Sequence, residues 1–169
     1  MKRLLVLAGF LLALVLTIAG VSWTQDKKSA VMPPSLEGFY MLMSRDLPDG
    51  TVLKSPAIGG LLTFTEKYRN FNIFWKDAKG NPVSISLMAS YTLTADKYTE
   101  NSLYYMENNK GEGLKYGLEP MTASAPVLPQ DGGFSIKFPM WGEPTVTFTG
   151  KTMTGTLEGV FVDHWVKVD

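Results

Sequence analysis

Cysteine is absent from all 169 residues of the chain. Its absence excludes disulfides and thiolate metal sites. It also excludes lipoprotein processing, because that route acylates a cysteine at the cleavage site. Histidine occurs once, as His164, so a serine-histidine-aspartate device would need that residue and a metal site would have a single histidine ligand.

An excess of basic charge is absent as well. The chain has 16 lysines and arginines against 16 aspartates and glutamates, and these charges are scattered singly along the sequence. A nucleic-acid surface needs a basic stripe or patch. We therefore expect no nucleic-acid partner.

Recognisable catalytic motifs are missing. No Gly-x-Ser-x-Gly elbow is present, and Gly150-Lys151-Thr152 lacks the upstream glycine of a phosphate-binding loop, because Thr145 stands there. Four glutamates share no strand or helix spacing, which predicts solvated side chains rather than a two-carboxylate site: Glu100, Glu107, Glu112 and Glu119. We predict no catalytic residue, no cofactor and no metal site.

The N-terminus has the layout of a secretory signal peptide. The basic pair Lys2-Arg3 precedes an apolar, uncharged run over residues 4–21, and small residues near its end suit a signal peptidase. We predict cleavage after Ala19, with Ser22 as the alternative. The run is near the lower length limit for spanning a bilayer, so an uncleaved anchor is the other reading and the only predicted membrane contact. Either way the protein is exported, to the periplasm or beyond.

A tether and one domain follow the signal peptide. Residues 20–35 are mostly small and polar and include Pro33 and Pro34, which predicts a disordered tether. The domain spans residues 36–169, enough to bury a core without disulfides.

Period-2 alternation indicates strands throughout that domain. In residues 83–94 the apolar positions fall on one face and serine, threonine and methionine on the other, as in a strand with one buried face. Turn residues separate the segments, and no helical period is convincing. The predicted strands are 36–45, 59–65, 70–76, 83–94, 97–107, 114–118, 133–138, 145–149, 152–157 and 159–168.

Many short strands with local turns favour an all-β, up-and-down antiparallel barrel of about eight to ten strands, because closure removes exposed sheet edges. The stretch 119–131 contains three prolines and shows no strand pattern. We expect it to be a loop, either an irregular crossover or a cover over a barrel mouth.

Three segments resemble bacterial lipocalin-like (calycin) domains. The stretch Leu36-Glu37-Gly38-Phe39-Tyr40-Met41-Leu42 is similar to the opening strand of that family, with tyrosine in place of the signature tryptophan. Residues 89–105 are similar to a central hairpin, and residues 163–168 to the closing strand. The resemblance implies that Lys167 closes the barrel floor against Tyr40, beside Gly38. It also implies an interior for one small apolar ligand.

Aromatic residues supply the candidate ligand contacts. The chain has nine phenylalanines, seven tyrosines and four tryptophans, and those on predicted strand faces either fill the barrel or line a pocket: Phe64, Trp75, Tyr91, Phe134 and Phe148.

His164 is a further candidate contact. Alternation places it with four valines on a core face, whereas the lipocalin resemblance places it outside, with Asp163 and Trp165 inside.

Three functions follow from these observations. The first is an exported lipocalin-like protein that binds or carries a small hydrophobic ligand. The second is an envelope interaction or structural module with a barrel filled by its own side chains, whose protein partner the sequence does not identify. The third is an isomerase-type enzyme acting in the barrel cavity, which the missing motifs disfavour.

Overall fold

The computed structural model describes residues 34–108 and 113–168. The predicted signal peptide and almost all of the predicted tether lie outside the described residues. Within the described part of the chain, no helix is long and apolar enough to cross a bilayer.

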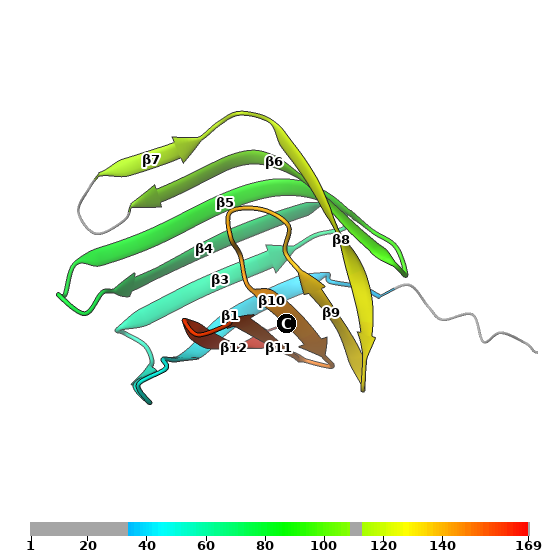
Figure 1. Cartoon of the computed structure of the whole chain (residues 1–169). Helices are drawn as coiled ribbons and strands as arrows, with labels where there is room; N and C mark the ends of the chain where they lie inside the picture. The colour runs from blue at the N-terminus through cyan, green and yellow to red at the C-terminus, as the bar shows by residue number, and fades with distance from the viewer. Residues whose placement is uncertain (1–33, 109–112, 169) are drawn as a thin grey trace, which may run out of the picture. The chain divides into compact units, whose positions relative to one another are not determined.

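Strands make up nearly all of the described structure (Figure 1). Their bounds are β1 Gly38–Asp46, β2 Val52–Leu53, β3 Ile58–Phe64, β4 Tyr68–Lys76, β5 Pro82–Leu93, β6 Lys97–Asn108, β7 Leu114–Gly117, β8 Met121–Gln130, β9 Gly133–Lys137, β10 Thr145–Thr149, β11 Thr152–Leu157 and β12 Phe161–Val168.

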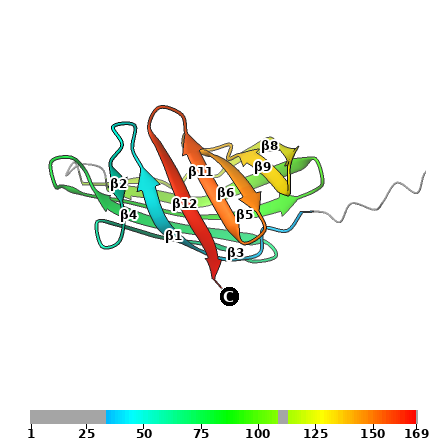
Figure 2. The same ribbon diagram turned by 90° about the horizontal axis from the view of Figure 1, so that it is seen from below.

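Among the described residues, ten of these strands form a closed antiparallel barrel in chain order, and β12 pairs with β1 to close it. Figure 2 shows β12 between β1 and β11. The two remaining strands are accessory, because β2 pairs only with β1 and β7 only with β6. The predicted all-β barrel of eight to ten strands is therefore confirmed. Such a barrel is compatible with a calycin-like fold.

The prediction of a loop over residues 119–131 is wrong, because β8 occupies most of it. Residues 121–126 pair with β6 and residues 127–130 pair with β9. The amide of Val127 points towards β6 and bonds Asp96. The backbone nitrogen of Pro126 therefore points towards β9, at a position where β8 does not yet pair with β9. The backbone nitrogen of Pro129 points towards the β6 side, at a position beyond the first residue of β6. At both positions no neighbouring strand would accept a hydrogen bond from a backbone amide, so a proline is tolerated there.

Two β-bulges change which residues face the interior. In β1, Leu42 pairs with Trp165 and Ser44 with His164, so Met43 is an extra residue. In β6, Leu103 is the extra residue between Ser102 and Tyr104. Both extra side chains are about half exposed. After each bulge the inward face moves by one position, since side chains alternate strictly along a strand.

Aromatic side chains fill one end of the barrel. Phe64 lies at the centre of this cluster, with ring centroids 5.5 Å from Tyr91, 6.2 Å from Tyr40 and 6.3 Å from Phe148. The rings are mostly edge to face, which is the favoured arrangement for aromatic pairs. Leu36, 1% exposed, packs into the same cluster. This end of the barrel is therefore packed with the protein's own side chains.

Lys167 crosses the filled end beside Tyr40. Tyr40 and Lys167 are cross-strand partners, and the ammonium lies 5.9 Å from the ring centroid. Gly38 makes space for the lysine stem, because a Cβ there would lie 2.2 Å from its Cε. The φ angle of Gly38, +137°, also favours glycine.

Candidate functional site

The other half of the barrel contains a cavity of about 240 Å³. Its apolar wall comes from inward faces of β4, β5, β11 and β12 and includes Phe71, Ile73, Trp75, Ile85, Leu87, Met153 and Trp165. The lining residues Trp75, Glu107, Leu157 and Phe161 are half-buried, so the cavity approaches solvent at that end of the barrel.

A buried ion pair lies in this wall. Arg45 donates from Nε and Nη2 to the two carboxylate oxygens of Asp163, at 2.6 and 2.8 Å. Both residues are about 5% exposed. The guanidinium also lies 3.9 Å from the ring centroid of Phe161 and 4.8 Å from that of Trp75. Burial raises the pKa of Asp163, although Arg45 opposes that shift.

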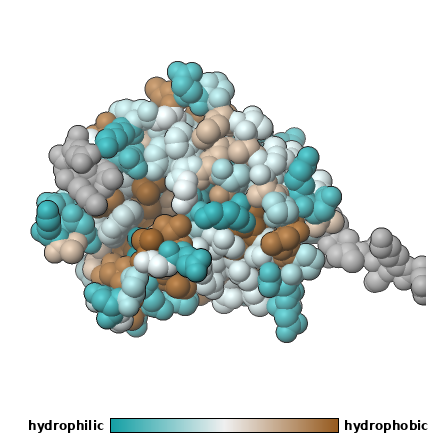
Figure 3. Space-filling model, in the orientation of Figure 1, coloured by the Kyte–Doolittle hydropathy of each residue, from teal (hydrophilic) through white to brown (hydrophobic). Residues whose placement is uncertain are grey.

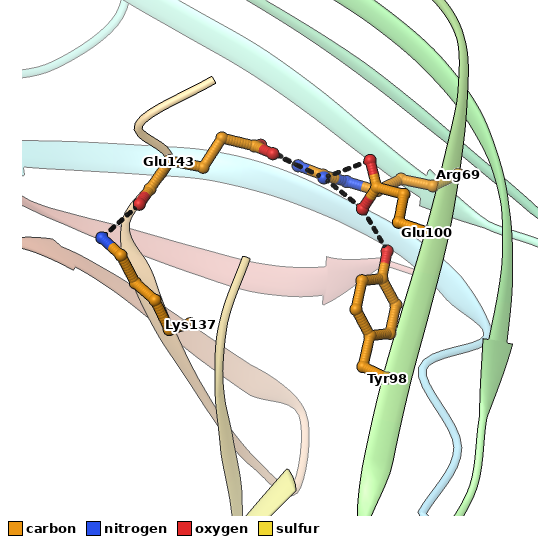
Figure 4. Close-up of polar contacts among 5 residues, drawn as sticks. All are labelled: Arg69, Tyr98, Glu100, Lys137 and Glu143. Carbon is orange, nitrogen blue, oxygen red and sulfur yellow. Dashed lines mark hydrogen bonds and ion pairs between the residues drawn. The ribbon is translucent and has the colours of Figure 1, made fainter. Parts of the chain in front are cut away.

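A second ionic cluster includes two residues of the cavity wall, Arg69 and Glu143 (Figure 4). Arg69 of β4 bonds the carboxylates of Glu100 on β6 and Glu143 in the loop between β9 and β10. Tyr98 donates its hydroxyl to Glu100. The side chains of Arg69 and Glu100 are at most 1% exposed, and that of Glu143 is 12% exposed. The guanidinium lies 4.0 Å from the ring centroid of Phe138.

In this cluster two carboxylates surround one cation, and this excess of negative charge contributes to the pKa shifts of its residues. Burial opposes the charged form of Arg69, but Glu143 and Glu100 outweigh burial and raise its pKa. Burial raises the pKa of Glu143, with Glu100 adding to the shift and Arg69 opposing it. Burial also raises the pKa of Tyr98. Arg69 therefore stays charged, and Glu143 binds a proton more readily than an exposed glutamate.

The loop between β9 and β10 forms another part of the cavity wall. Trp141 in this loop stacks on Tyr105 of β6, with centroids 4.3 Å apart and planes 11° apart. Gly117 of β7 leaves room for the indole, because a Cβ at that position would lie 2.5 Å from it. Trp141 has a φ of +54°, unusual for a residue with a side chain. The ring stack and the Arg69–Glu143 bond hold the loop in place.

Glu107 lies on the same inward face of β6 as Tyr105. The Tyr105 hydroxyl donates to Oε2 of Glu107 at 2.8 Å. Burial and the contact with Glu107 raise the pKa of Tyr105, so the phenol stays protonated and remains a donor. Both side chains line the cavity because the bulge at Leu103 turns them inward.

The structure separates the predicted ligand contacts into two groups. Trp75 lines the cavity. Phe64, Tyr91 and Phe148 belong to the buried core at the filled end, and Phe134 packs against that core. A ligand-binding role for these residues stays a prediction.

His164 lies on the outer side of β12. Its side chain is 45% exposed, and Nε2 lies 2.9 Å from the carboxylate of Asp46 on β1. The neighbours Asp163 and Trp165 face inward and line the cavity. The outward orientation that the lipocalin resemblance implied for His164 is the one observed. The alternation with the valines also holds, but the face that they share is the outer face of β12 and not the core.

The charged residues of the barrel interior were not predicted from the sequence. The expectation that Glu100 is solvated is wrong, since it is fully buried, whereas Glu119 is exposed and Glu112 lies outside the described residues. A signal was available for Arg69, because it alternates with Phe71, Ile73 and Trp75 on the apolar face of β4. None existed for Arg45, which faces inward only because of the bulge at Met43.

Within residues 34–108 and 113–168, no three aspartate, glutamate or histidine side chains are placed to hold a metal ion together. No known protein family, curated protein or solved structure matches the chain.

Proposed function

We propose that this protein is an exported lipocalin-like binding protein whose cavity holds a small molecule with a mostly apolar body. The observation that carries the proposal is the cavity of about 240 Å³ in the half of the barrel that its own side chains leave open. An apolar cavity of roughly 150 Å³ is enough to bind benzene. A ligand with more atoms than one aromatic ring therefore fits.

The walls suit such a ligand because they combine large apolar surfaces with few polar groups, the usual composition of small-molecule sites. The apolar groups include the indole of Trp165 and the side chains of Ile73 and Met153. The barrel also provides a rigid wall, since each of its ten strands in the described structure is paired on both sides. Export to the periplasm or beyond is the part of the proposal that the sequence of residues 1–21 supports.

A plugging substitution tests the binding function. Gly155 faces the cavity, and a Cβ there would meet Pro144, Asp163 and Val146 at ordinary contact distances of 3.5 to 3.8 Å. Gly155→Leu adds four carbons in the cavity, so an apolar fluorescent probe should bind at least tenfold more weakly. Thr154→Leu, on the outer face of the same strand, is the matched control and should leave the affinity unchanged.

Solvent extraction of wild-type protein from its own envelope, followed by mass spectrometry, should also yield an apolar molecule that Gly155→Leu protein lacks. Equal probe binding by wild-type and Gly155→Leu protein would show that the cavity is not the binding site. If the wild-type protein binds no probe and carries no molecule, the proposal is wrong.

A second candidate function is an envelope interaction module, and the outer face of β1 favours it. Met41 pairs with Leu61 on β3 and Val166 on β12, so three exposed apolar side chains lie in one row across three strands. Phe39, two residues earlier on the same face, is also 51% exposed. Elsewhere, on the face shown in Figure 3, apolar residues form separate patches among polar ones.

Site-specific photocrosslinking in the native envelope tests this second function. A crosslinker at position 41 should capture one defined partner, and a crosslinker at the exposed Thr122 of β8 should not. Equal labelling from both positions would contradict the interaction module.

A further inference from the structure

We propose that the cavity selects a ligand whose apolar body carries a positively charged amine, with the ammonium group placed at Glu107. This inference rests on the proposed binding function and adds the charge class of the ligand. Its basis is the distribution of charged groups around the cavity.

Both cations in the cavity wall already have carboxylate partners. Arg45 uses two nitrogens on Asp163, and Arg69 bonds both Glu100 and Glu143. A ligand carboxylate or phosphate would have to displace one of these buried carboxylates, leaving it unpaired at a large cost. In the described part of the chain, no other lysine or arginine lines the cavity. An anionic ligand is therefore disfavoured.

Carboxylates outnumber cations around the same space. Three carboxylates, of Glu107, Glu143 and Asp163, line the cavity with the two guanidiniums of Arg45 and Arg69. Outside the lining, Glu100 adds a carboxylate behind Arg69, and Lys137 adds a cation beside Glu143. A proton on Glu143, which the surroundings of that residue favour, cancels this excess of one charge but leaves the carboxylate of Glu107 without a cation beside it. The attraction for a cation is therefore local and centred on Glu107, because the other carboxylates around the cavity are paired with Arg45 and Arg69.

Glu107 is the one lining carboxylate that forms no ion pair with another described residue. Its Oε2 accepts the Tyr105 hydroxyl, and its Oε1 bonds no other described residue. Because Glu107 is half-buried, an ammonium group there keeps part of its hydration and is spared the cost of complete burial. A charge-assisted hydrogen bond from the ligand amine to Oε1 gives the second carboxylate oxygen of Glu107 a partner.

The aromatic walls favour a cation as well. The guanidinium of Arg45 already lies against the rings of Phe161 and Trp75, so this end of the cavity accepts positive charge on aromatic faces. The apolar body of the ligand then lies deeper, against Trp165 and Met153.

Three probes with one apolar body separate the charge classes: 2-(aminomethyl)naphthalene, 2-naphthalenemethanol and 2-naphthoate. Calorimetric titration of the wild-type protein at pH 7 should give the amine roughly tenfold tighter binding than the alcohol, because only the amine brings a positive charge to the carboxylate of Glu107. The naphthoate should bind most weakly. Tighter binding of the naphthoate or the alcohol than of the amine would overturn the inference and leave the binding function standing. Failure of all three to bind contradicts the binding function, and the inference with it.

Two variants locate the effect. Glu107→Gln keeps the shape of the side chain and removes its charge, so affinity for the amine should fall about tenfold while affinity for the alcohol stays unchanged. Glu66→Gln removes the same charge from the exposed turn between β3 and β4, at the filled end of the barrel, and should change neither. An unchanged amine preference in Glu107→Gln would rule out Glu107 as the recognition group.

Discussion

The buried pair of Arg45 and Asp163 offers a quantitative test of how the cavity wall is stabilised. Both residues are about 5% exposed, and two short hydrogen bonds join them. Removing one partner of a buried ion pair costs about 3–5 kcal/mol, because the other charge is left unpaired, whereas replacing both by apolar residues of similar size is often close to neutral. We therefore expect Asp163→Leu to lower the free energy of unfolding by about 3–5 kcal/mol.

The double variant should lose less free energy of unfolding than the two single variants lose in sum. Arg45→Met with Asp163→Leu removes both charges together, and the aromatic contacts of Arg45 with Phe161 and Trp75 become ordinary apolar packing. A coupling free energy of at least about 2 kcal/mol should result, within the range found for directly interacting residues. Urea denaturation followed by tryptophan fluorescence at pH 7 measures all four proteins.

Arg45→Met alone should differ from Asp163→Leu alone in its pH dependence. An unpaired aspartate can take up a proton, whereas an unpaired arginine cannot lose one. Burial already raises the folded-state pKa of Asp163 above 3.8. Protonation of Asp163 therefore stabilises the folded state fully at pH values below the pKa of this group in the unfolded state. That stabilisation is lost as the pH rises through the folded-state pKa. Destabilisation by Arg45→Met should thus shrink between pH 7 and pH 5 while that by Asp163→Leu does not. Additive single effects, or identical pH profiles, would refute this reasoning.

Three further predictions concern the termini and the filled end. Mass spectrometry of the envelope fraction should find a new N-terminus between Gly20 and Gln25, whereas an intact Met1 in the membrane would establish an uncleaved anchor. Lys167→Ala should lower the free energy of unfolding by about 1–2 kcal/mol through lost packing on Tyr40, and an unchanged urea midpoint would contradict the barrel-closure role. Burial raises the pKa of Tyr91 to about 12. The neutral phenol of Tyr91 therefore stabilises the folded state fully below the unfolded-state pKa of about 10, and this stabilisation is lost as the pH rises towards 12. Tyr91→Phe should flatten the fall in stability over this window, and a slope equal to wild type would exclude Tyr91 as its cause.

Local sequence determined the all-β class and most strand positions. The alternation over residues 83–94 corresponds to β5, in which Val83, Leu87, Ala89 and Tyr91 are buried. Such alternation can be recognised without the fold, because successive side chains of any strand point to opposite faces. The prolines led to the wrong prediction for β8, because the sequence of one strand does not show which of its backbone amides must donate a hydrogen bond to a neighbouring strand.

Which residues share the cavity was decided only in three dimensions. The bulges at Met43 and Leu103 depend on how β1 fits β12 and how β6 fits β5, and each moves the inward face by one residue. Arg45 and Glu107 line the cavity for that reason. The cluster of Arg69, Glu100 and Glu143 joins residues 31 and 74 positions apart in the sequence. Closure of the barrel, which no local pattern encodes, brings them within bonding distance.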